Sequence, residues 1–146
     1  MDLTTEKLTP MPLRAQNRCF GCGQANENGL RLEFLIAEDK SVVCLLEVSE
    51  RFEGPPGTVH GGIIATLLDE AMSKAIRAQG VTAVTRQMEV EYLRPVHPAT
   101  SIRIEGRLLR SEGRKYWTEG RILNPRGKVL AASRGLFIEL GSGHGF

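Results

Sequence analysis

Residues 52–71 read FEGPPGTVHGGIIATLLDEA, and this stretch contains the change from a constrained loop to the helix around which the chain is organised. Glycines and two adjacent prolines restrict the loop, whereas the residues after it place apolar side chains in pairs four positions apart. These side chains are Ile63, Ile64, Leu67, Leu68, Ala71, Met72, Ala75 and Ile76. The spacing predicts one amphipathic helix that starts beside His60, ends by Gly80 and buries a broad apolar stripe.

Strands are predicted on both sides of this helix. Before it, residues 30–37 and 41–48 are rich in strand formers and are separated by a turn at 38–40. After it, apolar and polar side chains alternate around residues 88–92 and 102–108, and further strands are predicted over 114–123 and 128–140. Because the connections are mostly short turns, such as Asn124-Pro125-Arg126-Gly127, the strands must be antiparallel. The sequence therefore predicts an α+β fold with one antiparallel sheet around one helix.

The size and composition of the chain are those of one globular domain. Its 146 residues are 41% hydrophobic and 25% charged, and we expect an extended lead-in over 1–18, a domain over 19–140 and a disordered tail over 141–146. A net charge of +2 argues against nucleic-acid binding, and no apolar stretch is long enough to span a membrane. The first residues lack the apolar region of a secretory signal, and three cysteines are too few for a disulfide scaffold, so a cytoplasmic location is predicted.

The start of the helix, His60-Gly61-Gly62, is a candidate binding site for negative charge. The first amides of a helix lack partners within the helix and lie at the positive end of its dipole, where they favour an anion or a developing oxyanion. Glycine also removes the Cβ atom that would keep a ligand away from these amides. The alternative interpretation is that the two glycines only let the helix start pack against a strand.

Asp69 is the candidate catalytic carboxylate, although Glu70 fits the periodicity equally well. Asp69 follows His60 by nine residues, which is about 13.5 Å along a helix and too far for both to act on one reacting centre. If both residues are functional, two chains must meet with their helices antiparallel and form two equivalent composite sites. Otherwise Asp69 is a surface residue that flanks the apolar stripe.

Two further motifs accompany the helix. VEYLRPV follows it at residues 90–96, and a CFGCG segment followed by NGL precedes it over Cys19–Leu30. Together with residues 52–71, these motifs resemble the hotdog-fold acyl-CoA thioesterases of the PaaI-like and THEM-type group, over about residues 19–140. The resemblance implies a hotdog fold, in which an antiparallel sheet wraps around one long central helix. It also implies a homodimer with a continuous sheet and active sites at the interface; dimer or homotetramer, as a dimer of dimers, stays open.

The resemblance also implies an activity and residue roles. The expected reaction is hydrolysis of an acyl-CoA thioester to free acid and CoA, with Asp69 as general base or nucleophile. Gly61 of the partner chain would supply the oxyanion-hole amide, with His60 beside it, and Thr85 would position the water. Phenylacetate-type enzymes have an asparagine six residues before the histidine, whereas this chain has Gly54. The mechanism is therefore expected to be closer to that of the THEM-type enzymes.

Placement in the family makes Arg103, Arg114 and Lys115 the candidates for binding the phosphates of CoA, because proteins commonly meet phosphates with such side chains at strand ends. The alternative is that they form a solvated basic face. Acyl-CoA is expected as the partner and substrate, and no separate cofactor is expected. Two other functions stay open: a non-catalytic acyl-CoA-binding or ligand-sensing module, and, as the third choice, a hotdog dehydratase or hydratase.

The remaining candidate ligands are not expected to form a metal site. Cys19 and Cys22 have the spacing of half a zinc site, but no second pair follows them, so we expect them to order a turn without metal. Cys44 is interpreted as a small buried hydrophobe, and His97, between two prolines, as a loop residue.

Overall fold

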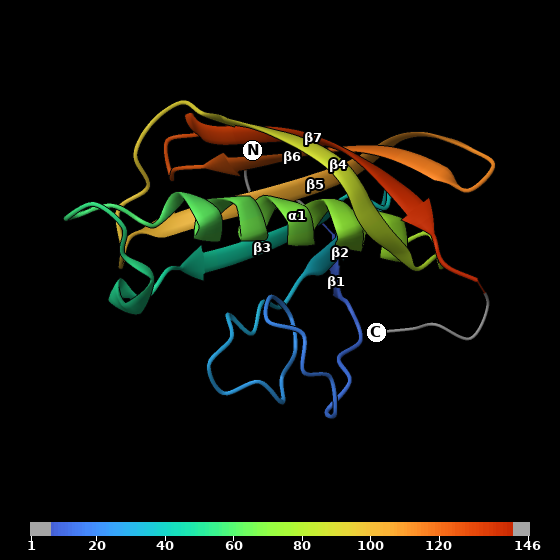
Figure 1. Cartoon of the computed structure of the whole chain (residues 1–146), viewed down its shortest axis with the longest axis horizontal. Coiled ribbons are helices and arrows are strands. Elements are labelled where there is room, and N and C mark those ends of the chain that lie inside the picture. The colour runs from blue at the N-terminus through green and yellow to red at the C-terminus, as the bar shows by residue number, and fades with distance from the viewer. Residues whose placement is uncertain (1–6, 142–146) are drawn as a thin grey trace.

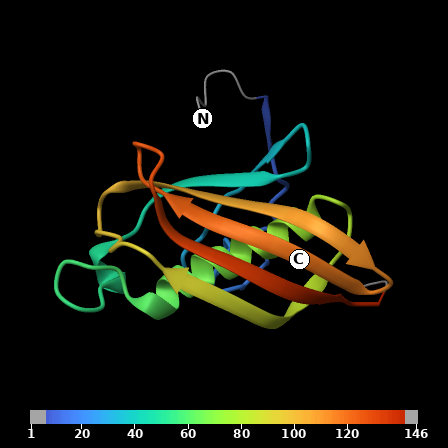
Figure 2. The same ribbon diagram turned by 90° about the horizontal axis from the view of Figure 1, so that it is seen from above.

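One long helix, α1 (Gly61–Arg77), lies across one face of a seven-stranded antiparallel sheet (Figure 1). The computed structural model describes residues 7–141 of the chain. The strands are β1 (Leu8–Pro10), β2 (Leu35–Ala37), β3 (Val42–Glu47), β4 (Ala83–Tyr92), β5 (Ser101–Glu112), β6 (Lys115–Leu123) and β7 (Val129–Glu139). Their order across the sheet is β1-β2-β3-β5-β6-β7-β4, so that β4 forms one edge (Figure 2). This is the predicted arrangement of one antiparallel sheet around one helix.

The helix has the predicted bounds, for identifiable reasons. His60 is its N-cap residue, and its side chain accepts a hydrogen bond from the Gly62 amide. Lys74 and Arg77 in the last turn complement the negative end of the helix dipole. The chain then leaves the helix and turns at Gly80, whose φ of 85° favours glycine. The apolar stripe is buried, with Leu67, Leu68, Ala71, Met72, Ala75 and Ile76 fully inaccessible.

Small residues in the central strands let the helix come very close to the sheet. A Cβ atom added at Gly106 of β5 would overlap the backbone carbonyl of Ala71 on the helix. An addition at Gly135 of β7 would press on the Phe137 ring and on Met72, and one at Gly120 of β6 would lie 3.0 Å from Ser133 Oγ and 3.4 Å from Met72 Cγ. These three strand positions therefore fix the depth at which α1 packs, and with it the position of every side chain on the helix.

The segment before β3 differs from the prediction. Instead of a strand over 30–37, only β2 is regular, because residues 20–32 form an irregular loop held by backbone bonds such as Leu30 N–H to Phe20 O. The lead-in also contains a strand, β1, at the edge of the sheet, where Pro10 is tolerated. The tail expected over 141–146 lies outside the described residues from 142 onward. No helix within residues 7–141 is long and apolar enough to cross a membrane.

Candidate active site

Asp69, in the middle of α1, points toward the edge strand β4 and is held there by Thr85. The Thr85 hydroxyl Oγ1 donates a hydrogen bond to Asp69 Oδ1 at 2.5 Å. Asp69 is half-buried and Thr85 is exposed, so the carboxylate is oriented by the protein and still open to solvent. The two residues that the sequence resemblance pairs as catalytic are therefore in direct contact.

A β-bulge next to Thr85 makes this contact possible. In the ladder between β4 and β7, Thr85 pairs with Phe137 and Gln87 pairs with Leu136, so Arg86 is an extra residue. Because side chains alternate along a strand, the extra residue shifts the alternation by one position. Ala83 and Thr85 before the bulge, and Met88 and Val90 after it, therefore all face the helix and core.

At the start of α1, one backbone amide has no hydrogen-bond partner in the described part of the chain. The Gly62 amide donates to His60 Nδ1 at 2.9 Å, and the amides of Ile63 and Ile64 donate to the His60 carbonyl. In contrast, the Gly61 amide has no hydrogen-bond acceptor among residues 7–141. It lies at the positive end of the helix dipole, which is where an oxyanion is stabilised.

His60 and Tyr92 shape the surroundings of this amide. Since His60 Nδ1 accepts from the Gly62 amide, the neutral imidazole carries its proton on Nε2, and the side chain is exposed. The Tyr92 hydroxyl at the end of β4 donates to the Gly61 carbonyl at 2.9 Å. This bond ties the helix start to the edge strand. The YLRP motif contained Tyr92, but its contact with Gly61 had no signal in the sequence.

Gly61 and Asp69 do not meet within one chain. They lie eight residues apart on the same helix, which is about 12 Å. Within one chain the described residues thus keep two features apart: the Asp69–Thr85 pair, and the Gly61 amide at the helix start with His60 beside it.

The three basic residues expected to bind CoA phosphates lie at two opposite ends of the sheet. Lys115 shares a ladder row with Ile138 and Val84, next to Thr85, and so lies at the end of the sheet where β4 begins. Arg114 precedes it, and its guanidinium donates to the Glu139 carbonyl at 2.8 and 3.2 Å. Arg103, in contrast, pairs with Leu123 at the other end of the sheet.

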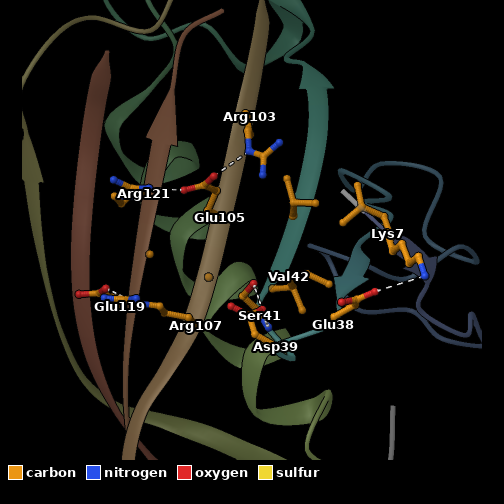
Figure 3. A pocket seen from close by; sticks show the side chains of 15 residues that line it. Lys7, Glu38, Asp39, Ser41, Val42, Arg103, Glu105, Arg107, Glu119 and Arg121 are labelled. Carbon is orange, nitrogen blue, oxygen red and sulfur yellow. Dashed lines mark hydrogen bonds and ion pairs between the residues drawn. The ribbon is translucent and has the colours of Figure 1, made fainter. Parts of the chain in front are cut away.

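Arg103 also lies on the outer face of the sheet, away from α1. There it donates from Nε to Glu105 at 2.7 Å, and Arg121 reaches the same carboxylate at 2.6 Å (Figure 3). Burial raises the pKa of Glu105, but the hydrogen bonds from the two arginines outweigh this effect and hold the pKa below its ordinary value. These side chains line a groove of about 810 Å³ that mixes both charges and includes Lys7 and Glu38. The groove is remote from the Asp69–Thr85 pair in the fold.

Glu70 is distinguished from Asp69 by its partners. It is 9% exposed and lies under the loop that carries Cys19 and Cys22. Cys19 Sγ donates to Glu70 Oε1 at 3.4 Å, and Lys74 Nζ lies 3.0 Å from Cys22 Sγ. Burial and the charge of Glu70 raise the pKa of the Cys22 thiol to about 11, so this thiol is not an activated nucleophile.

The other two candidate ligands have structural surroundings. Cys44 is buried in β3, and burial raises the pKa of its thiol to about 11, as expected for a small core residue. His97 lies in the loop after β4, where its Nδ1 is 2.8 Å from the Gly57 carbonyl and joins this loop to the one before α1.

Comparison with known proteins assigns the fold to a family. A model of the thioesterase superfamily matches residues 56–131, which include α1, β4, β5 and β6. The chain belongs to the thioesterase superfamily. Among curated thioesterases, acyl-coenzyme A thioesterase THEM4 of Bos taurus is 31% identical over 118 residues, which cover 78% of this chain and 48% of that protein. The chain thus spans about half the length of the curated relatives it matches first.

Solved structures of thioesterase-superfamily proteins have the same fold. One crystal structure of such a protein is 30% identical, has a TM-score of 0.79, and is matched over 84% of this chain and 60% of that chain. PaaI of the Escherichia coli phenylacetic acid degradation operon is 21% identical with a TM-score of 0.70, over 75% of this chain and 80% of that one, which shows the fold alone. The hotdog fold and the resemblance to the PaaI-like and THEM-type group are confirmed.

Proposed function

We propose that this protein is a hydrolase that cleaves acyl-CoA thioesters to free acid and CoA. The observation that carries the proposal is the Asp69 carboxylate on the central helix of a thioesterase-superfamily fold, oriented by Thr85 and open to solvent. The name of the THEM4 relative, an acyl-coenzyme A thioesterase, supports the choice of substrate class. The predicted cytoplasmic location and the absence of a separate cofactor stay predictions.

Asp69 supplies the base or the nucleophile in this proposal. With Oδ1 held by the Thr85 hydroxyl, Oδ2 faces the thioester and either accepts a proton from the attacking water or attacks the carbonyl carbon itself. Hydrolysis through water forms the acid C–O bond, breaks the C–S bond, and leaves CoA as the thiol. Gly54 stands where phenylacetate-type enzymes have an asparagine, so orientation of the water falls to Thr85 and Asp69.

The oxyanion of this reaction needs a donor that one chain does not bring to Asp69. The unpartnered Gly61 amide of a second copy supplies it in our proposal, with His60 Nε2 as a neighbouring donor. The second copy docks along β4, a ten-residue edge strand whose outer backbone groups have no strand partner among residues 7–141. Pairing of β4 with its symmetry mate gives two equivalent sites per homodimer. Further pairing of dimers into a tetramer is compatible with this arrangement.

The CoA moiety is assigned to basic side chains near β4. Lys115 is exposed at the end of the sheet that carries Thr85, and Arg114 is its neighbour, so both are proposed to meet CoA phosphates. Arg103 was the third candidate, but its guanidinium is engaged with Glu105 on the outer face. Arg103 also lies at the end of the sheet opposite to Thr85 and Lys115, so we rank it below Lys115 as a phosphate-binding residue.

The decisive experiment is an acyl-CoA panel with short, long and aromatic acyl groups, in which released CoA is measured with Ellman's reagent. We expect turnover by the wild type and a loss of kcat of about 10²–10⁴-fold in Asp69→Asn. Asp39→Asn, in the turn between β2 and β3, is the matched control and should keep wild-type activity. If the wild type hydrolyses none of the acyl-CoA thioesters faster than Asp69→Asn does, the hydrolase proposal is wrong. Saturable acyl-CoA binding without turnover would instead support the ligand-binding alternative.

A further inference from the structure

Cys19, Cys22 and Glu70 form a cluster outside the proposed active site. One ligand atom of each, two thiol sulfurs and a carboxylate oxygen, lies within 4.8 Å of the other two. The cysteines come from the loop before β2 and the glutamate from α1, so Glu70 lies 51 and 48 positions after the two cysteines and meets them across the loop–helix contact. We propose that these three side chains bind a Zn²⁺ ion that fastens the loop to the central helix.

The spacing of the three atoms suits tetrahedral zinc. Zn–S bonds of about 2.3 Å and Zn–O bonds of about 2.0 Å place two sulfurs about 3.8 Å apart and a sulfur and an oxygen about 3.5 Å apart. The distance between Cys19 Sγ and Glu70 Oε1 is 3.4 Å, and no pair in the cluster exceeds 4.8 Å. Side-chain movements of less than about an ångström therefore complete the geometry. Two sulfur ligands favour zinc over magnesium or calcium.

The loop is pre-shaped around the ligands by its backbone. The Gly23 amide donates to the Cys19 carbonyl at 2.8 Å, which closes the C-x-x-C turn. The Leu32 amide donates to the Gly21 carbonyl at 2.9 Å and holds the turn against the segment that leads to β2. A Cβ atom at Gly21 would overlap the Glu70 side chain, so the turn lies directly on this carboxylate. These backbone contacts reduce the entropy that metal binding must remove.

Lys74 balances the charge of the proposed site. Its ammonium lies 3.0 Å from Cys22 Sγ and 3.9 Å from Glu70 Oε2. Two thiolates and one carboxylate carry three negative charges, which Zn²⁺ and one ammonium neutralise together. A neutral buried cluster avoids the desolvation penalty of an unbalanced charge. On binding, each thiol releases its proton to solvent, and Lys74 stays as a hydrogen-bond donor to the Cys22 sulfur.

The position of the site gives it a structural role. Its three protein ligands leave one coordination position for water, so the ligation is more open than that of a four-ligand structural zinc site. Glu70 faces the N-terminal loop, whereas the neighbouring Asp69 faces Thr85 on β4, so the ion is not presented to the Asp69–Thr85 pair. The metal proposal therefore stands independently of the hydrolase proposal. It revises the expectation that the two cysteines only order a turn.

The test uses the whole chain, reduced and freed of metal by a chelator that is then removed. Zn²⁺ is titrated against a chromophoric chelator, and Co²⁺ is added to a parallel sample to record its visible spectrum. We expect one ion per chain, a tetrahedral Co²⁺ spectrum with thiolate-to-metal charge transfer, and a rise in Tm of several degrees with Zn²⁺. Cys22→Ser and Glu70→Gln should each weaken binding at least tenfold. Cys44→Ser, which removes the buried thiol of β3, is the matched control and should bind like the wild type.

Three results would overturn the proposal. One is wild-type Zn²⁺ binding no tighter than that of Cys22→Ser. Another is a Glu70→Gln variant with unchanged Zn²⁺ affinity and an unchanged Co²⁺ spectrum, which would show that α1 supplies no ligand to the ion. The third is loss of binding in Cys44→Ser. Where circular dichroism shows that Cys22→Ser does not fold, Cys19→Ser at the half-exposed position takes its place.

Discussion

The Thr85 hydroxyl donates a 2.5 Å hydrogen bond to the Asp69 carboxylate, across the contact between the central helix and the edge strand. The bond engages one carboxylate oxygen, and the other has no hydrogen-bond partner among residues 7–141. Asp69 stays only half-buried, so a water molecule or a substrate can approach it. Thr85 therefore acts on the proposed chemistry through Asp69, as a positioning residue.

Removal of this hydroxyl should lower kcat with little effect on KM. Thr85→Val keeps the shape of the side chain but lets the carboxylate rotate, so we expect kcat for the preferred acyl-CoA to fall about 10- to 100-fold. Thr85→Ser restores the donor and should recover most of the activity. Steady-state kinetics on the three proteins provide the measurement. A large rise in KM at constant kcat, or no recovery with serine, would contradict a positioning role.

Mixed dimers test whether each active site contains residues from two chains. Asp69→Asn removes the proposed base, and Gly61→Val covers the helix-start amide, where an added Cβ meets only the Tyr92 ring at an ordinary 3.6 Å. Both variants should be inactive alone. Co-expressed at equal levels with different tags, they should recover about a quarter of wild-type activity, because half of the dimers are mixed and each has one intact site. If both functional groups belong to one chain, the mixture will show no recovery.

Lys115 should contribute to binding CoA and not to the chemical step. Lys115→Met keeps the length of the side chain and removes its charge, so we expect KM for acyl-CoA to rise about 3- to 10-fold with kcat nearly unchanged. The same acyl group on a short thiol without phosphates should be hydrolysed equally by both proteins. Lys128→Met, an exposed lysine beyond the turn between β6 and β7, is the matched control. If Lys115→Met raises KM equally for the CoA thioester and for the short thioester without phosphates, Lys115 does not contact a CoA phosphate.

Gly106 should be intolerant of a larger side chain. In Gly106→Ala the new methyl group overlaps the Ala71 carbonyl on α1, so the helix must shift and the free energy of unfolding should fall by about 1–3 kcal/mol. Gly141→Ala adds the same atom where nothing lies within 4 Å and should have no effect. Urea unfolding of both variants gives the comparison. Equal stability of Gly106→Ala and wild type would mean that the helix is not packed at this depth.

The ion pairs of Glu105 should stabilise the fold above mildly acidic pH. The native pKa of Glu105 is lowered from 4.5, despite its burial, by hydrogen bonds from Arg103 and Arg121. Such stability is fully present above the unfolded pKa and is lost as pH falls through the native pKa. Glu105→Gln should therefore be less stable than wild type by about 1 kcal/mol at pH 7, and the difference should shrink below pH 4.5. Glu27→Gln, on an exposed loop, is the control and should be as stable as wild type. Urea unfolding at several pH values gives the comparison, and a stability difference between Glu105→Gln and wild type that does not change with pH would contradict the prediction.

The sequence by itself determined the layout of the fold. Pairs of apolar residues four apart can bury a stripe only as a helix, and alternating residues joined by short turns can only form antiparallel strands. The turn at Asn124 is an example: its carbonyl accepts from the Gly127 amide at 2.9 Å, with Gly127 at a φ of 80°. These preferences are local, so they can be recognised in the sequence without knowing which segments pack against one another. The strand predicted over residues 30–37 includes the end of the loop at 30–32, where Leu30 and Leu32 donate to Phe20 and Gly21 within the loop and not to a neighbouring strand.

Tertiary structure decided the partners of the two adjacent carboxylates. Helix periodicity places Asp69 and Glu70 at opposite borders of the apolar stripe and cannot tell which border meets which segment. Packing directs Asp69 to Thr85 and Glu70 to Cys19. The bulge at Arg86 turns Thr85 toward the helix, although the alternation read back from Met88 would turn it away. A side chain's partners depend on how distant segments pack, and a register shift of one residue, which no local pattern encodes, reverses the face that a strand presents.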